Sequence, residues 1–114
     1  MKKKLFTNYN FEFDKNEKKL LINFCKQALK QMSSDDKFFA EVKAFNSILD
    51  KLQSNSGGEQ IKFTKDERTR LSHQLKQNAE FMKKQIDKSG FIKKWLYRSL
   101  HKQYENILEN HFKD

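Results

Sequence analysis

The sequence has no proline, three glycines and a single cysteine among its 114 residues. Because proline and glycine are the residues that most often interrupt helices, their scarcity favours long helical segments. One cysteine, Cys25, leaves no partner for a disulfide within the chain, and its place on an apolar helical stripe predicts a buried side chain and not a reactive thiol. No run approaches the roughly 18 apolar residues of a membrane span.

The sequence is rich in charged and aromatic residues. Charged residues make up 34% of the chain and hydrophobic residues 36%, and eleven phenylalanines supply large side chains for a core. This composition is typical of a folded helical protein with a charged exterior. The length suits one domain over residues 1–114, without room for a deep substrate cavity.

Two segments fifty residues apart, 11–21 and 61–71, repeat one pattern of Phe, Lys, Glu and Leu. A second match joins residues 45–50 to 104–109. We therefore predict an internal duplication of residues 11–52 and 61–112. The linker between the copies, residues 53–60, contains Gly57-Gly58.

Each copy begins with a capping-box signature, in which a residue that starts a helix is followed three positions later by glutamate. Asp14 and Glu17 form this pattern in the first copy, and Thr64 and Glu67 form it in the second. The triplets before the boxes alternate apolar and polar residues as a half-buried strand does. We therefore predict a minor two-stranded β-ladder near residues 11–13 and 61–63.

Apolar residues at helical spacing predict four helices, over residues 16–32, 38–52, 65–88 and 91–112. Ser33-Ser34-Asp35-Asp36 separates the first two and is expected to cap the second. Short connections make neighbouring helices antiparallel, so the predicted fold is mainly α, an antiparallel four-helix bundle built from two duplicated αα-hairpins. Each predicted helix has an apolar stripe along one side. In chain order the stripes are Leu21, Phe24, Cys25, Ala28 and Met32 in the first helix; Phe38, Val42, Phe45, Leu49 and Leu52 in the second; Leu71, Leu75, Ala79, Met82 and Ile86 in the third; and, on or near the apolar side of the fourth, Ile92, Trp95, Leu96, Leu100, Tyr104, Ile107 and Leu108.

The residue types that carry catalysis or bind metals are not grouped in this sequence. His73, His101 and His111 have none of the spacings that assemble zinc or di-iron sites. Adjacent Asp35 and Asp36 are better explained as residues at a helix start than as an acid–base pair. The sequence therefore predicts no enzyme activity, no metal and no cofactor.

Positive charge is the remaining signal, at a formal net charge of +9 and a pI near 9.6. Between Lys83 and Lys102 there are seven basic residues and one acid, Asp87, with aromatic residues interleaved. The alternative interpretation is a solvated exterior in which Phe91 and Trp95 belong to the core. The predicted binding residues are Lys93, Lys94, Trp95, Arg98 and Lys102.

Three functions fit this pattern, and the first is a small non-enzymatic module that acts as a regulator, adaptor or inhibitor by binding another protein. The second is binding of RNA or single-stranded DNA, because basic and aromatic side chains together neutralise phosphates and stack on bases. Specific readout of duplex DNA is disfavoured because the chain has 21 lysines and only three arginines. This lysine excess is also typical of AT-biased coding, as in small reading frames of phages and mobile elements.

The third reading is an immunity protein. In size, charge and helix number the chain resembles bacteriocin immunity proteins, which are small basic cytoplasmic four-helix bundles. A cytoplasmic location is also expected because the basic residues 2–4 are not followed by the apolar segment of a signal peptide.

Overall fold

The computed structural model describes residues 9–55, 60–88 and 90–112, leaving aside the side chains of residues 91 and 92. It is 83% helical, with four α-helices and one small antiparallel sheet, which confirms the predicted fold class. The elements in chain order are β1 (Tyr9–Phe11), α1 (Lys15–Met32), the 3₁₀ turn η1 (Asp36–Phe38), α2 (Phe39–Ser54), β2 (Ile61–Phe63), α3 (Lys65–Lys88) and α4 (Phe91–His111).

The chain divides into two compact units, Met1–Arg70 and Leu71–Asp114, and each is described by itself. The boundary between them falls inside α3. The predicted duplication seam lies elsewhere, in residues 53–60, and its Gly57-Gly58 pair lies outside the described residues. A single domain made of two duplicated copies therefore remains a prediction.

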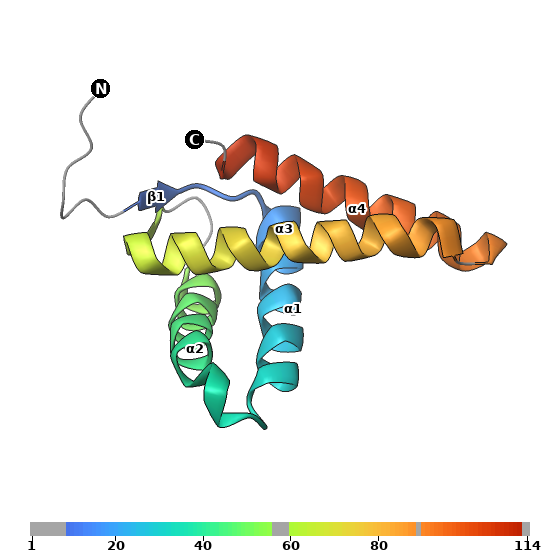
Figure 1. Cartoon of the computed structure of the whole chain (residues 1–114). Helices are drawn as coiled ribbons and strands as arrows, with labels where there is room; N and C mark the ends of the chain where they lie inside the picture. Colours follow the sequence, from blue (N-terminus) through green and yellow to red (C-terminus); the bar gives the residue numbers. More distant parts are fainter. Residues whose placement is uncertain (1–8, 56–59, 89, 113–114) are drawn as a thin grey trace. The chain divides into compact units, whose positions relative to one another are not determined.

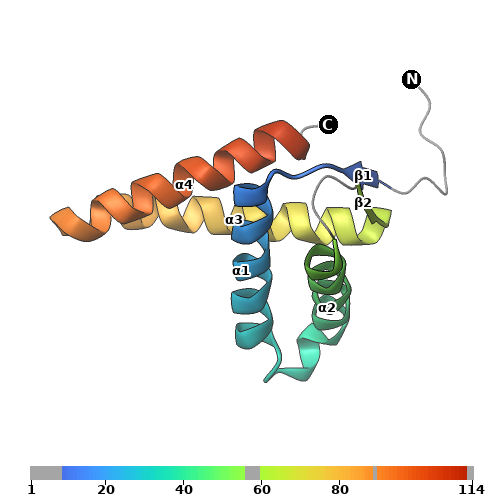
Figure 2. The same ribbon diagram turned by 180° about the vertical axis from the view of Figure 1, so that it is seen from behind.

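The first unit contains a helical hairpin in which α1 and α2 run antiparallel side by side (Figures 1 and 2). The stripe predicted for α1 is buried at Leu21, Phe24, Cys25 and Met32, and Ala28 is half-buried. The stripe predicted for α2 was rotated from the true one. The buried residues of α2 are Ala44, Phe45, Ile48 and Leu52, whereas Phe38, Val42 and Leu49 are half-buried or lie at the helix end.

The connection between α1 and α2 corrects the predicted cap. Asp35 accepts a hydrogen bond from the Lys37 backbone N–H at 3.1 Å and so begins η1 and not α2. The α-helix itself begins at Phe39 without a side-chain cap. A short 3₁₀ turn is a common way to enter an α-helix.

The two strands pair antiparallel, with Phe11 opposite Ile61 and Tyr9 opposite Phe63. The first strand lies two residues earlier than predicted, because it is Tyr9–Phe11 that forms the ladder while Phe13 follows it. The phenylalanine rings cluster on one face: the Phe63 ring centroid lies 5.2 Å from that of Phe11 and 6.4 Å from that of Phe13. This cluster is a buried aromatic core at the helix starts.

Both predicted capping boxes are present. In the first, the Glu17 backbone N–H donates to Asp14 Oδ1 at 2.7 Å, and the Asp14 N–H donates to Glu17 Oε1 at 3.0 Å. In the second, the Glu67 N–H donates to Thr64 Oγ1 at 3.1 Å, and the Thr64 N–H donates to Glu67 Oε1 at 2.9 Å. Each box begins its helix one residue after the cap, at Lys15 and Lys65.

The second unit is also a helical hairpin, in which the part of α3 after Arg70 and α4 lie antiparallel (Figure 1). Its buried residues lie in the half away from the connection at residues 89–90. Among residues 80–103 whose side chains are described, none is buried. In the described ranges of both units, no helix combines the length and the apolar character needed to cross a membrane. The buried residues of this unit are Leu71, Ser72, Leu75, Ala79, Tyr104, Ile107 and Phe112.

Candidate functional site

Helix α4 begins differently from α1 and α3. Its N-cap is Gly90, which has no capping side chain, and its first turn contains no acidic residue. Instead, the first turn carries Lys93 and Lys94. Because a helix N-terminus has a partial positive charge, lysines placed there raise the positive potential and are unfavourable for the isolated helix. The start of α4 is therefore a concentrated positive end.

The five predicted binding residues do not all share one face of α4. Trp95, Arg98 and Lys102 stand at i, i+3 and i+7, so they form one stripe, and all three are exposed. Lys94 lies beside this stripe and is half-buried. Lys93 is exposed but lies about half a turn around the helix from Trp95, because two residues rotate the helix by about 200°.

Two side chains assigned to the apolar stripe of α4 are exposed, which corrects that assignment. Leu96 was expected on the buried side and is 49% exposed, whereas Trp95, placed on or near the apolar stripe and also predicted as a binding residue, is 71% exposed. The alternative that Trp95 belongs to the core is therefore wrong. Phe81 on α3 is also 55% exposed and was not predicted as a site residue. Its position off the α3 stripe was the sequence signal that could have identified it.

The basic residues of this hairpin lie close together in the sequence and form no ion pair with the described residues. Within the described residues, none of the seven basic side chains from Lys83 to Lys102 forms an ion pair. In the first unit, Lys51 pairs with Glu67, and Arg70 pairs with Glu41 and Asp66, whereas Lys15, Lys19 and Lys26 form no ion pair with a described residue. The hairpin therefore carries positive charge that no carboxylate of the described chain neutralises.

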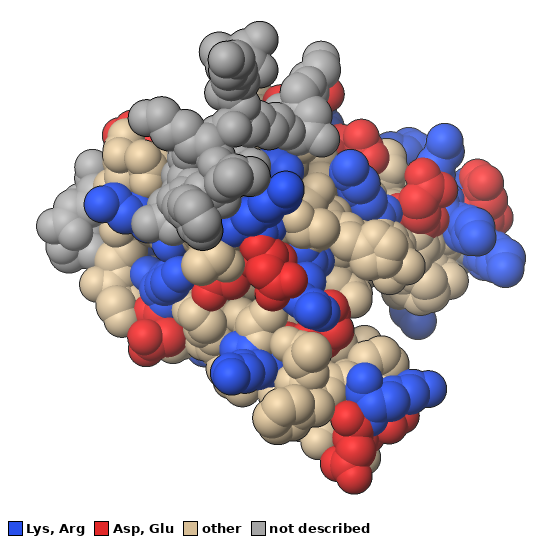
Figure 3. All heavy atoms as spheres, turned by 60° about the vertical axis from the view of Figure 1, so that its left-hand side comes forward, with Lys and Arg blue, Asp and Glu red and all other residues tan. Residues whose placement is uncertain are grey.

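Charges of both signs are mixed on one face of the molecule. Figure 3 shows Lys and Arg side chains interspersed with Asp and Glu side chains on the face it presents. Such mixing is the ordinary pattern of a solvated exterior. By sequence, the segment from Lys83 to Lys102 contains seven basic residues and one acid, Asp87.

We define the basic–aromatic face as Lys94, Trp95, Arg98 and Lys102 on α4, with Leu96 on its flank; Lys93 lies on another side of the helix, at the same helix start. Its chemistry is that of a binding surface. Exposed indole and leucine side chains offer apolar area, and the cations offer charge to an anionic ligand.

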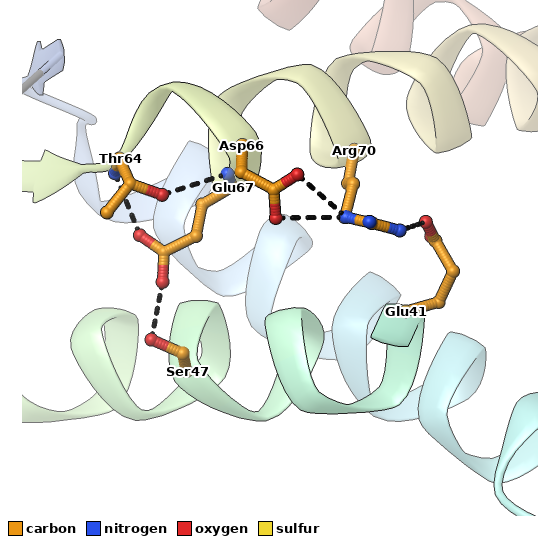
Figure 4. A network of polar contacts seen from close by, with 6 residues as sticks. All are labelled: Glu41, Ser47, Thr64, Asp66, Glu67 and Arg70. Carbon is orange, nitrogen blue, oxygen red and sulfur yellow. Dashed lines mark hydrogen bonds and ion pairs between the residues drawn. The ribbon is translucent and has the colours of Figure 1, made fainter. Parts of the chain in front are cut away.

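A second cluster of charged groups lies in the first unit, around Glu67 (Figure 4). Glu67 is only 6% exposed. Besides closing its capping box, its carboxylate accepts hydrogen bonds from Ser47 Oγ at 2.5 Å and from Lys51 Nζ at 2.6 Å. Arg70, one turn along α3, donates to Asp66 and to Glu41 of α2. The cluster thus ties the first turns of α3 to α2.

The protonation state of Glu67 identifies this cluster as structural. Burial alone raises the pKa of Glu67, but hydrogen bonds from Lys51, Ser47 and the Thr64 backbone together outweigh burial and lower the pKa below its usual value. The carboxylate is therefore ionised and fully engaged at neutral pH. A group held in this way stabilises the fold and is poorly suited to exchange protons with a substrate.

The Cys25 thiol and the potential metal ligands of the described residues form no candidate site. Burial raises the pKa of the Cys25 thiol to about 12, so the thiolate that reacts with electrophiles or metals is scarce at neutral pH. In the ranges that the structure describes, no three His, Cys, Asp or Glu side chains are grouped so as to hold a metal ion.

Comparisons with protein-family models, with curated proteins and with solved structures found no match. The class of protein is therefore defined by fold and surface alone. It is a basic, mainly α-helical protein of two helical hairpins, one of which presents an unpaired basic–aromatic face.

Proposed function

We propose that this protein is a non-enzymatic module that binds another protein through the basic–aromatic face of α4. The observation that carries the proposal is the exposure of Trp95 on the same stripe as Arg98 and Lys102. Exposing a tryptophan to water is unfavourable, and tryptophan and arginine are the residues that most often dominate binding energy at protein interfaces. A regulator, adaptor or inhibitor that occupies its partner needs only such a face.

The apolar neighbours of Trp95 favour protein over nucleic acid as the ligand. Leu96 has no aromatic face for a base to stack on, yet it is half exposed. Phe81 adds a third exposed apolar side chain in the same hairpin. Apolar side chains of mixed shape are typical of the centre of a protein interface.

Nucleic-acid binding is the second candidate, and the Trp95–Arg98–Lys102 stripe is the observation that favours it. An exposed indole between cations can stack on an unpaired base while the cations contact phosphates. This function would concern RNA or single-stranded DNA. The immunity-type reading has support only from size, charge and helix number.

A matched pair of charge-reversed variants tests the proposed function. The triple change Lys94→Glu, Arg98→Glu and Lys102→Glu removes three cations of the face. The control triple, Lys15→Glu, Lys19→Glu and Lys26→Glu, reverses three exposed lysines that share one side of α1. Both triples lower the formal net charge of +9 by the same amount.

Affinity purification from the native host, with nuclease treatment, distinguishes the two candidates. We expect wild type and the control triple to retain a protein partner after nuclease, and the face triple to lose it. If nucleic acid is the ligand, binding should disappear with nuclease. The slope of log K against log salt should then flatten by about two to three units in the face triple. Equal retention by both triples would contradict the proposed site.

Lys93→Glu provides a prediction in which stability and binding change in opposite directions. A glutamate in the first turn of α4 complements the helix dipole and can reach back to the Gly90 N–H, so the free energy of unfolding should rise by about 0.3–1 kcal/mol. Binding of the partner should weaken. Lys76→Glu, an exposed change in the middle of α3, serves as the control and should alter stability by less than about 0.5 kcal/mol. Denaturant unfolding and binding assays on both variants measure the two effects.

A stabilised Lys93→Glu protein that binds as wild type does would place Lys93 outside the site. Loss of stability in the same variant would contradict the account of the α4 start.

A further inference from the structure

We propose that the partner segment is an acidic amphipathic helix that packs along the basic–aromatic face and the adjoining end of the α3–α4 hairpin. The inference rests on the proposed function, since it names the chemistry of the ligand for that same face. It adds three specific claims about the ligand. The segment is negatively charged, it is helical, and it has one apolar side.

The exposed apolar side chains of the hairpin end argue for an apolar side on the ligand. No described side chain in residues 80–103 is buried, although Phe81, Trp95 and Leu96 lie in this range. A further helix packed on this hairpin can remove such side chains from water, because a helix buries more of its apolar circumference as more elements pack on it. A third helical layer would cover them.

Unpaired charge argues for a negative ligand. The cations from Lys83 to Lys102 have no ion pair within the described chain, and the only acid in that range is Asp87. The uncapped start of α4 adds its own partial positive charge next to Lys93 and Lys94. Carboxylates on a docked segment would complement both features. The same cations and the positive helix start would repel basic ligands.

The surface itself argues for a helix and not a strand. Strand addition needs an unpaired sheet edge, and the described part of this hairpin consists of helices alone. The stripe Trp95–Arg98–Lys102 covers two helical turns, about 10 Å along α4. A ligand helix with apolar residues at i, i+3 or i+4 and i+7 matches this length and packs by the usual ridges and grooves.

Trp95 is the only tryptophan in the chain, so its fluorescence reports directly on the face. The full chain is titrated at physiological salt with a synthetic helix of about five turns, with Leu along one side and Glu elsewhere. We expect a blue shift of the emission and protection from acrylamide quenching. The face triple with Glu at positions 94, 98 and 102 should bind at least about tenfold more weakly than wild type. The control triple with Glu at positions 15, 19 and 26 should bind as wild type does.

Three further probes decide between the claims. A peptide of the same composition, permuted so that leucines no longer line one side, should bind at least about tenfold more weakly. A peptide with Lys in place of Glu should not bind. Oligo-dT and oligo-U of matched charge should bind more weakly than the acidic helix.

Each contrary outcome overturns a different part of the inference. Equal binding of the permuted peptide would overturn the amphipathic helix and leave an acidic protein ligand in place. Equal binding of the lysine peptide would overturn the acidic ligand. Tighter binding of either oligonucleotide would overturn the proposed protein-binding function itself. Failure of every peptide to bind would overturn the helical ligand.

Discussion

Phe63→Ala is expected to lower the free energy of unfolding by about 3–5 kcal/mol, the usual cost of truncating a buried phenylalanine to alanine. Phe63 is fully buried in β2, in contact with the rings of Phe11 and Phe13. Lys51 Nζ also lies 6.0 Å from its ring centroid. Removing the ring would leave a cavity where the ladder meets the starts of α1 and α3. Urea unfolding followed by circular dichroism measures the loss.

Phe39→Ala is the matched control, because Phe39 is 74% exposed at the start of α2. The same truncation there should change the free energy of unfolding by less than about 0.5 kcal/mol. Phe63→Leu, which keeps most of the volume, should cost less than about 1.5 kcal/mol. Similar losses at positions 39 and 63 would contradict the assignment of the aromatic cluster as core.

The two capping boxes provide the second large prediction. Glu17→Ala removes a cap whose hydrogen bonds are exposed, and should cost about 1 kcal/mol. Glu67→Ala removes the equivalent cap and also leaves Ser47 and Lys51 without their acceptor in a part-buried position. It should therefore cost about 2–4 kcal/mol. Parallel unfolding measurements compare the two variants. Equal losses of unfolding free energy would show that the hydrogen bonds from Ser47 and Lys51 to Glu67 do not stabilise the fold.

The Glu67 cluster also predicts a pH dependence with a defined sign. The pKa of Glu67 is lowered in the folded state, so its contribution to stability is fully present above the unfolded glutamate pKa, about 4.3. That contribution is lost as pH falls through the lower folded value. The stability difference between wild type and Glu67→Gln should shrink in this acidic range. A difference that grows on acidification would contradict the lowered pKa.

Much of the fold could be predicted from the sequence because helix starts and stops are local features. The capping boxes at Asp14 and Thr64 fixed the starts of α1 and α3 to within one residue. The ladder was predicted from the alternating triplets, and its first strand lies two residues earlier than predicted because alternation continues before Phe11 and does not fix where pairing begins. The second helix showed a similar limit. Ile48 is buried where the predicted stripe had Leu49, because the neighbouring elements, and not periodicity alone, determine which side of a helix is buried.

The candidate site was harder to predict because exposure is a property of the assembled hairpin. Helical spacing put Trp95 and Leu96 on or near an apolar stripe, and spacing alone cannot show that both side chains are exposed. The cations at Arg98 and Lys102 were visible in the sequence, yet their lack of ion pairs was not. The network joining Glu67 to Ser47 also escaped prediction, because its members are twenty residues apart in the chain.

One cross-linking measurement tests the binding face most directly. Trp95 is replaced by the photoreactive residue benzoylphenylalanine and the protein is irradiated in its native host. Replacement of Phe39, an equally exposed aromatic residue in the first unit, serves as the control. The account predicts that position 95 cross-links to a specific protein, that the product survives nuclease, and that position 39 gives no such product. A nuclease-sensitive product at position 95, or the same products from both positions, would contradict it.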